Sequence, residues 1–335
     1  MAVLVTGGAG YIGSHTAIEL LESGKDIVII DNFYNSCPKV LDRIKELSGR
    51  DFSFEECDIR DREGLDKVFE KYDIDGVIHF AAFSSVAESV ELPQKYFKNN
   101  YKNTLNLLKI MREFNVDKFI LSSTAAVYGN PTQIPITEDT DLKPINPYGH
   151  SKFITEKALE REAEKGDFNY VSLRYFNAAG ADFDCEVGEL HDPETHLIPL
   201  ILDAAIGKRD SISIFGTDYD TPDGTCIRDY IHVVDLADGH VKAIEKIKEN
   251  PGVEVYNLGT GNGYSVLDMV KNFEAATGVK VPYVIKERRP GDIATCYADA
   301  KKAKEELGWE AQFGIKEMCE DAWRWQSQNP NGYEE

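Results

Sequence analysis

Apolar runs of strand length alternate with amphipathic segments of helical periodicity through the first half of this 335-residue chain. The strand-type runs lie near 2–6, 26–30, 52–56, 76–80 and 118–122, and a further run extends from Val171 to Phe176. The helical patterns between them lie near 11–23, 61–72, 94–115 and 148–165. Such alternation predicts an α/β fold, with helices on both faces of a doubly wound, Rossmann-type parallel sheet.

The pattern changes after Asn177, where proline and glycine separate shorter elements. Helical patterns recur near 197–206, 234–248, 265–276, 299–307 and 315–327. We therefore expect a Rossmann-type domain at 1–176 and a smaller mixed α/β C-terminal lobe at 177–335. Their boundary is soft, because segments of the lobe are expected to interleave with the first domain.

The first apolar run breaks into a Gly-x-x-Gly-x-x-Gly motif at Gly7, Gly10 and Gly13, followed by an amphipathic stretch. Strand, tight turn and helix form the context of a dinucleotide fingerprint, in which a pyrophosphate sits at a helix N-terminus. The second run ends at Asp31. A carboxylate there accepts hydrogen bonds from a ribose 2′-hydroxyl and repels a 2′-phosphate. The motif predicts NAD rather than NADP.

Tyr148 and Lys152 are four residues apart in a helical pattern, so both side chains are expected on one face of a helix. A phenol has a reference pKa of about 10 and is a poor base at neutral pH. A neighbouring ammonium favours the phenolate and so lowers the pKa of the phenol. The spacing predicts a general base at Tyr148.

Composition excludes several classes of function. The net charge of −21 argues against nonspecific nucleic-acid binding and against an anionic membrane surface. No apolar run is long enough to span a bilayer, and the start of the chain lacks the pattern of a signal peptide, so a cytoplasmic location is expected. The six cysteines show no metal-ligand spacing, which predicts reduced thiols and no metal site.

These motifs have a family resemblance. The chain resembles the extended short-chain dehydrogenase/reductases, and within them the UDP-glucose 4-epimerase (UDP-galactose 4-epimerase) family. The resemblance runs nearly end to end, and its most specific segments are Gly10–His15, Asp31-Asn32, Ser122–Thr124, Pro147–Gly149, Arg174–Asn177, Arg228–His232 and Arg289–Asp292. It implies reversible C4 epimerisation of UDP-glucose and UDP-galactose through a 4-keto intermediate, with tightly bound NAD, in a homodimer.

The resemblance also assigns roles to single residues. It makes Thr124 the third catalytic member beside Tyr148 and Lys152. The implied cofactor-binding residues are Gly7, Gly10, Tyr11, Ile12, Gly13, Asp31, Asn32, Asn35, Ser36, Asp58, Ile59, Phe80, Ala81, Ala82, Ser84, Asn99, Thr124, Tyr148, Lys152 and Phe176. The implied UDP-sugar-binding residues are Asn177, His196, Leu197, Phe215, Arg228, Arg289, Asp292 and Cys296. Physically, the two arginines suit a diphosphate and Phe215 offers a stacking face for uracil.

Five positions depart from patterns in the wider family. Ala125-Ala126 stands where related 4,6-dehydratases carry an Asp-Glu pair, and alanine performs no acid–base chemistry, which disfavours elimination of water. Ser84 replaces a lysine that reaches the cofactor, and His196 replaces an asparagine. Cys296 stands where some relatives carry a tyrosine that crowds the sugar. The smaller side chain predicts that UDP-N-acetylglucosamine and its galactosamine epimer are also accepted.

Three functions stay open at the level of the sequence. The first is the UDP-hexose 4-epimerase. The second is another NAD-dependent UDP-sugar 4-epimerase, or a reductase with net redox. The third is a catalytically silent NAD-binding regulator, which would be expected to lose the tyrosine or the lysine that this chain keeps.

Overall fold

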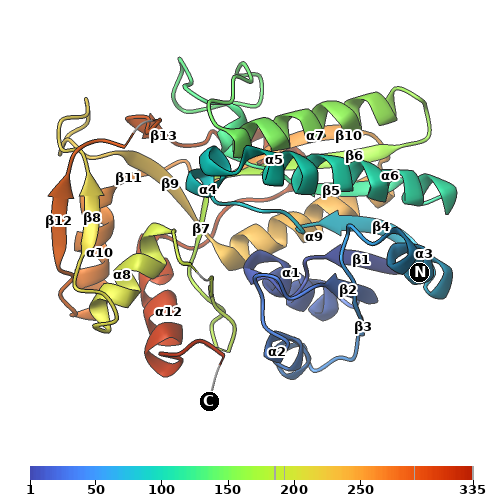
Figure 1. Ribbon diagram of the computed structural model, residues 1–335, viewed down its shortest axis with the longest axis horizontal. Coiled ribbons are helices and arrows are strands. Elements are labelled where there is room, and N and C mark those ends of the chain that lie inside the picture. Colours follow the sequence, from blue (N-terminus) through green and yellow to red (C-terminus); the bar gives the residue numbers. More distant parts are fainter. Residues whose placement is uncertain (185, 192, 290, 334–335) are drawn as a thin grey trace.

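The computed structural model describes residues 1–184, 186–191, 193–289 and 291–333 (Figure 1). Its main sheet has seven strands in the order β10-β6-β5-β4-β1-β2-β3, and every pair is parallel. The strands are β1 (Ala2–Thr6), β2 (Ile27–Asp31), β3 (Ser53–Glu56), β4 (Ile74–His79), β5 (Lys118–Ser122), β6 (Asn169–Tyr175) and β10 (Val253–Leu258). The predicted doubly wound parallel sheet is confirmed.

Helices bury both faces of this sheet, so its central strands are continuous runs of Val, Ile and Leu. One face packs against α1 (Tyr11–Glu22), α2 (Lys39–Ser48), α9 (Val233–Glu249) and α11 (Lys301–Leu307). The opposite face packs against α3 (Arg62–Lys71), α6 (Thr104–Glu113) and α7 (Pro147–Ala163). The connection from β4 to α6 runs through α4 (Val86–Glu91), α5 (Pro93–Tyr96) and a π-helical turn (Phe97–Asn103).

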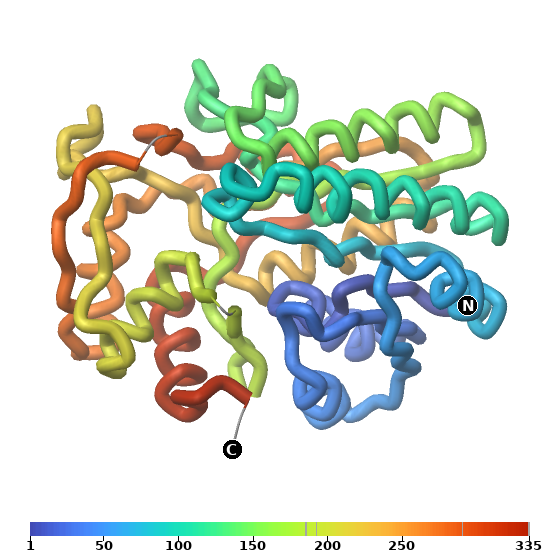
Figure 2. The backbone as a smooth tube through the Cα atoms, in the orientation of Figure 1, coloured from blue at the N-terminus to red at the C-terminus, as the bar shows by residue number. Residues whose placement is uncertain are grey.

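The smaller lobe is mixed α/β and lies on the left in Figure 1, apart from the main sheet. Its strands β7 (Asn177–Ala179), β9 (Ile227–His232), β11 (Gly263–Ser265) and β13 (Thr295–Cys296) form one sheet, and β8 (Ile212–Phe215) pairs with β12 (Tyr283–Lys286). Its helices α8 (Leu197–Ala205), α10 (Val266–Thr277) and α12 (Ile315–Gln328) pack into a separate core with Tyr230 of β9. The tube in Figure 2 shows the chain crossing between lobe and sheet more than once.

Two elements from the second half of the chain belong to the main sheet. β10 pairs along β6, from Val253 opposite Tyr170 to Leu258 opposite Tyr175, and α9 lies against the sheet's underside. The domain boundary at 176/177 stays a prediction. The main sheet includes residues from both sides of that boundary. Of the helices in the described ranges, none combines the length and the apolar character needed to cross a membrane.

Candidate active site

The glycine turn joins β1 to α1 at the carboxyl edge of the sheet, where doubly wound folds bind ligands. Gly7 has φ +70°, and a Cβ there would lie 2.8 Å from the amide nitrogen of Ala81, just beyond β4. A Cβ on Gly13 would overlap the carbonyl oxygen of Gly7. Gly10 begins α1 and its amide donates to Gly7 O at 3.1 Å. The turn thus fits a pyrophosphate, which needs bare backbone at a helix N-terminus.

Asp31 organises the loops beside this turn. Its carboxylate is buried and accepts from the backbone N–H of Ala9 at 3.0 Å, from the N–H of Phe33 at 2.9 Å and from Ser36 Oγ at 2.8 Å. A carboxylate offers about four acceptor positions, so one stays available for a ribose hydroxyl. The predicted ribose contact and a structural role are therefore compatible.

A cavity of about 240 Å³ opens on the glycine turn. It contains four of the predicted cofactor residues, Gly10, Tyr11, Asn35 and Ser36. Its other walls are Ala9 of the glycine turn, Tyr34 and Cys37 of the loop after β2, Val40 of α2, Gly188 and Leu190 of the loop after β7, and Tyr333 near the end of the chain. Tyr11 contributes through its ring and backbone, because its hydroxyl donates to Gly180 O at 2.8 Å. These residues could hold the phosphate end of a dinucleotide.

Further predicted cofactor residues lie on the loops that follow β2, β3 and β4, and Asn99 lies in the π-helical turn. Asn32 Nδ2 donates to Asp58 Oδ2 at 2.6 Å, and hydrogen bonds from Arg60 lower the pKa of Asp58 to about 2. Phe80 N donates to Thr6 O at 3.0 Å, which places Phe80, Ala81 and Ala82 beside the glycine turn, while Ser84 is exposed. Ile59 is buried after β3, and Asn99 donates its side-chain amide to Asn100 Oδ1 at 3.2 Å.

The three predicted catalytic side chains converge at the end of β5. Thr124 follows β5, and its hydroxyl lies near enough to the buried phenol of Tyr148, on the first turn of α7, to lower the pKa of that phenol. Lys152 lies one turn further along α7 and donates from Nζ to the carbonyl oxygen of Ser122 at 2.7 Å. Asn146 caps α7 by accepting from Gly149 N at 2.8 Å, and this cap fixes where the helix and its tyrosine begin.

Burial dominates the protonation of this cluster. It raises the pKa of Tyr148 above its ordinary value; the nearby Tyr175 adds to this rise, while the Thr124 hydroxyl opposes it. Burial also lowers the pKa of Lys152 to about 8. We expected Lys152 to make Tyr148 acidic, but burial is the largest effect on the pKa of the phenol, and the Lys152 ammonium donates to the Ser122 carbonyl. A further positive charge beside the phenol is needed to favour the phenolate.

A small apolar cluster adjoins the catalytic residues. Cys296 is buried there with Ala125, and Phe176 packs against the same group. β13 places Cys296 opposite Arg228 of β9, whose guanidinium donates to the carbonyl oxygens of Ile227 and Ile293, both at 2.8 Å. The structure thus brings three predicted site residues from distant parts of the chain, Phe176, Arg228 and Cys296, to one side of the catalytic cluster.

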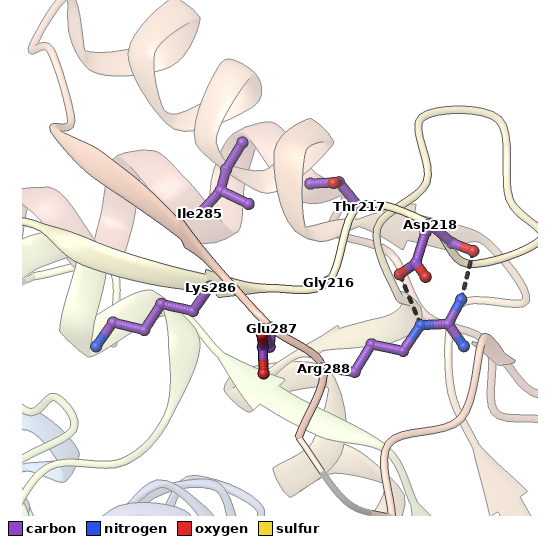
Figure 3. A pocket seen from close by; sticks show the side chains of 7 residues that line it. All are labelled: Gly216, Thr217, Asp218, Ile285, Lys286, Glu287 and Arg288. Atoms are coloured by element: carbon purple, nitrogen blue, oxygen red, sulfur yellow. Dashed lines mark hydrogen bonds and ion pairs between the residues drawn. The ribbon is translucent and has the colours of Figure 1, made fainter.

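Other predicted substrate residues form a group in the smaller lobe. The Arg289 guanidinium lies 4.7 Å from the ring centroid of Phe215 and pairs with Asp292 at 2.9 Å. Beside them is a cavity of about 600 Å³ lined by Gly216, Thr217, Asp218 and residues 285–288 (Figure 3). Its lining consists of sequence neighbours of Phe215 and Arg289, with Arg288 bound to Asp218 Oδ1 at 2.7 Å. Asn177, apart from this group, donates to Asp229 O at 2.7 Å.

His196 has a partner that the sequence did not indicate. It precedes Leu197, the first residue of α8, and its Nδ1 lies 2.6 Å from Glu189 Oε1. Burial lowers the pKa of His196, but the Glu189 carboxylate outweighs burial and raises that pKa to about 9. With His191 and Glu194 these residues place four possible metal-ligand atoms within 4.8 Å of one another. No metal site was expected, because the spacing of Cys and His residues does not reveal a mixed Glu/His group. In the structure the four side chains form ion pairs with one another.

Several contacts around the site could not be predicted from the sequence. Ser122 acts through its carbonyl oxygen, and its hydroxyl donates to Tyr175 at 3.0 Å. The Tyr96 ring lies 6.4 Å from the Tyr148 ring. A backbone acceptor has no residue signature, and the aromatic neighbours are identified only once the elements are folded. The described cysteines are free, and Cys185 lies outside the described residues.

Residues 4–322 match the model of a protein family described as GDP-mannose 4,6 dehydratase. A UDP-glucose 4-epimerase of Bacillus subtilis is 53% identical over 99% of both chains, and one of Homo sapiens is 50% identical over 99% of this chain and 98% of its own. The chain belongs to this family, and within it to the UDP-glucose 4-epimerases. A crystal structure of the Bifidobacterium longum UDP-glucose 4-epimerase in complex with NAD⁺ and UDP has a TM-score of 0.96 at 48% identity, covering 99% of this chain and 100% of that one.

Membership in the UDP-glucose 4-epimerases accounts for the lobe arrangement. The glycine turn, the Tyr148 cluster and the group around Phe215 all occur in a chain that matches its relatives over nearly its whole length. No large insertion or deletion separates the cofactor half from the smaller lobe. The roles of the individual residues stay predictions.

Proposed function

We propose that this protein interconverts UDP-glucose and UDP-galactose by reversible oxidation at C4, through a 4-keto intermediate. The observation that carries the proposal is the buried Tyr148 phenol, which lies beside the Thr124 hydroxyl at the same sheet edge as the glycine turn. A base next to a nucleotide-binding turn serves hydride chemistry at a carbinol carbon, where the hydroxyl proton and the hydride leave together.

The chain's own residues hold and move the proton. Tyr148 takes the O4 proton, with the Thr124 hydroxyl relaying it, and returns it after the 4-ketosugar has presented its other face. When bound, NAD would accept the hydride from C4 and return it. The cofactor would therefore finish each turnover in the oxidation state in which it began. When bound, the cation of the oxidised nicotinamide would add positive charge near the buried Tyr148. Lys152, anchored on Ser122, adds to that field.

The residues after Thr124 argue against the dehydratase activity in the family's description. Thr124 caps a short helix, Ala125–Val127, by accepting from Ala126 N at 3.1 Å. Neither Ala125 nor Ala126 can move a proton at C5 or C6 of a sugar, so C4 redox is left as the reaction. A reductase would show net NADH formation or consumption, and a silent regulator would bind NAD without turnover.

Substrate binding falls to the smaller lobe. Arg228 and Arg289 supply charge for the diphosphate, and Phe215 supplies a stacking face for uracil. Asp292 becomes available to a ribose hydroxyl if Arg289 turns from it to the phosphates. The thiol of Cys296 fills little of the apolar cluster beside the catalytic residues, and we therefore propose that N-acetylated UDP-hexoses are also substrates.

We further propose a cytoplasmic homodimer, on the strength of the family resemblance. Light scattering on the purified protein tests the dimer, since one chain has a mass of 37.6 kDa and a dimer has twice that mass.

The decisive experiment incubates purified protein with UDP-galactose, and separately with UDP-N-acetylgalactosamine, without added cofactor. Chromatography should show the C4 epimer approaching an equilibrium mixture, while absorbance at the NADH band stays constant over many turnovers. Stoichiometric NADH formation would support the reductase instead. Bound NAD without any epimer would support the silent regulator.

A further inference from the structure

Two loops meet at the carboxyl edge of the sheet on either side of the glycine turn. The sheet order places β1 between β2 and β4, so the loops after β2 and β4 flank the turn that follows β1. Tyr34 comes from the first loop and Phe83 from the second. Their rings contact each other edge to face, with centroids 5.1 Å apart. This contact joins the two flanking loops.

Lys95 of α5 binds both rings. Its Nζ lies 4.2 Å from the Phe83 ring centroid and 5.1 Å from that of Tyr34, and it donates to the Tyr34 hydroxyl at 3.0 Å. The ammonium is attracted by the quadrupole of the Phe83 ring, and its hydrogen bond to the Tyr34 hydroxyl ties it to the second side chain. We call this group of Tyr34, Phe83 and Lys95 the aromatic bridge.

The Lys95 ammonium is itself held by an ion pair. Glu88 of α4 accepts from Lys95 Nζ at 2.7 Å through one oxygen and from the Tyr96 hydroxyl at 2.8 Å through the other. Ser85 caps α4 by accepting from the backbone N–H of Glu88 at 3.3 Å. Glu88 therefore holds the Lys95 ammonium in place against the loop that follows β2.

Tyr34 is at once one end of the bridge and a wall of the cavity on the glycine turn. We propose that the aromatic bridge is a cofactor-retaining device, in which Lys95 keeps the Tyr34 wall in place beside the bound dinucleotide. This proposal rests on the proposed NAD cofactor.

The test measures cofactor release rather than turnover. Native protein, Lys95→Met, Tyr34→Ala and the double variant are purified, and bound NAD per chain is determined after denaturation. Release rates are then followed by exchange with a fluorescent NAD analogue. Tyr34 is 62% exposed, so Tyr34→Ala leaves the core intact. Lys98→Met is the matched control, because Lys98 is exposed three positions beyond Lys95 and loses the same charge.

Each single variant should release NAD about fivefold or more faster than the native protein, from the loss of cation–π and charged hydrogen-bond contacts. The double variant should be no faster than the faster single one, since both remove the same bridge. Lys98→Met should match the native protein. Unchanged release from a folded Lys95→Met, or fully multiplicative effects in the double variant, would overturn the bridge. Absence of NAD from the native protein would instead overturn the proposed function.

Discussion

The phenolic oxygen of Tyr148 is the single atom on which the proposed chemistry depends. Replacing Tyr148 with Phe keeps the ring that contacts Tyr96 and removes only the proton acceptor. Positioned acid–base catalysis contributes about 10²–10⁴-fold, so kcat for epimerisation should fall by that factor. Initial rates with UDP-galactose measure the change, and bound NAD should stay at the native level. A Phe variant with native kcat would contradict the assignment.

Cys296 is the residue that should decide substrate range. Its side chain is buried among Ala125, Phe176 and their neighbours, so a Cys296→Tyr ring must extend into the space beside the catalytic residues. The ratio of kcat/KM for UDP-N-acetylgalactosamine to that for UDP-galactose should fall roughly tenfold to hundredfold. Cys319→Ser, a buried thiol in the other core, is the control and should leave the ratio unchanged. An unchanged ratio in the tyrosine variant would contradict the pocket assignment.

Single residues also show where sequence reasoning ended. Spacing predicted that Tyr148 and Lys152 share a helix face, and it placed Asp31 at the end of a strand. It did not predict that burial would raise the pKa of Tyr148, because the depth of a side chain depends on every element packed over it. Nor did it predict that Glu189 would pair with His196, since an ion pair in a loop leaves no periodic trace.

Helix α7 carries two of the predicted catalytic residues, and a buried ion pair fixes it to β6. Glu156, one turn beyond Lys152, binds Arg174 at 2.6 Å, with side-chain exposures of 2% and 5%. Ser123 donates to the same carboxylate at 2.5 Å, which adds the end of β5 to the network. A pair this deep is stabilising only while both charges are present, because a lone buried charge keeps its full desolvation cost.

Glu156→Gln should therefore lower the free energy of unfolding by about 3–5 kcal/mol, since it leaves the Arg174 guanidinium without a counter-charge. Urea denaturation followed by circular dichroism measures the change. Glu160→Gln is the matched control on the same helix: Glu160 pairs with Lys157 at 42% and 41% exposure, and its loss should cost about 0.5 kcal/mol or less. Equal effects of the two substitutions would show that the buried pair does not anchor α7.

Long helices with a clear start in the sequence were predicted, and elements that depend on distant partners were not. The predicted helices near 11–23 and 148–165 correspond to α1 and α7, which follow the glycine turn and Asn146-Pro147, whereas the strongly amphipathic α2 was not predicted. β10 was missed because Val253–Leu258 alternates weakly and its partner β6 lies about eighty residues upstream. Parallel pairing of that kind is settled by tertiary contacts rather than by sequence nearby.

At the scale of the whole molecule, Tyr333 from the last part of the described chain lies beside the glycine turn that follows β1. Tyr333 lines the same cavity as Gly10 and Tyr11, and its ring packs at 5.7 Å from that of the buried Trp325. Its hydroxyl accepts from the backbone N–H of Gly188 and donates to the Gly188 carbonyl, both at 3.1 Å. Three segments far apart in sequence thereby close one side of the cavity on the glycine turn.

This closure predicts that the last residues stabilise the whole fold rather than a local tail. Tyr333→Phe removes the two hydrogen bonds to Gly188 and should lower the free energy of unfolding by about 1 kcal/mol. Tyr333→Ala also removes the ring from Trp325 and should cost about 2 kcal/mol or more. Urea denaturation, monitored by tryptophan fluorescence and by circular dichroism, should show both losses in one cooperative transition. If fluorescence shifted alone while the circular dichroism midpoint stayed native, the tail would be a separate unit and the closure would not stabilise the fold.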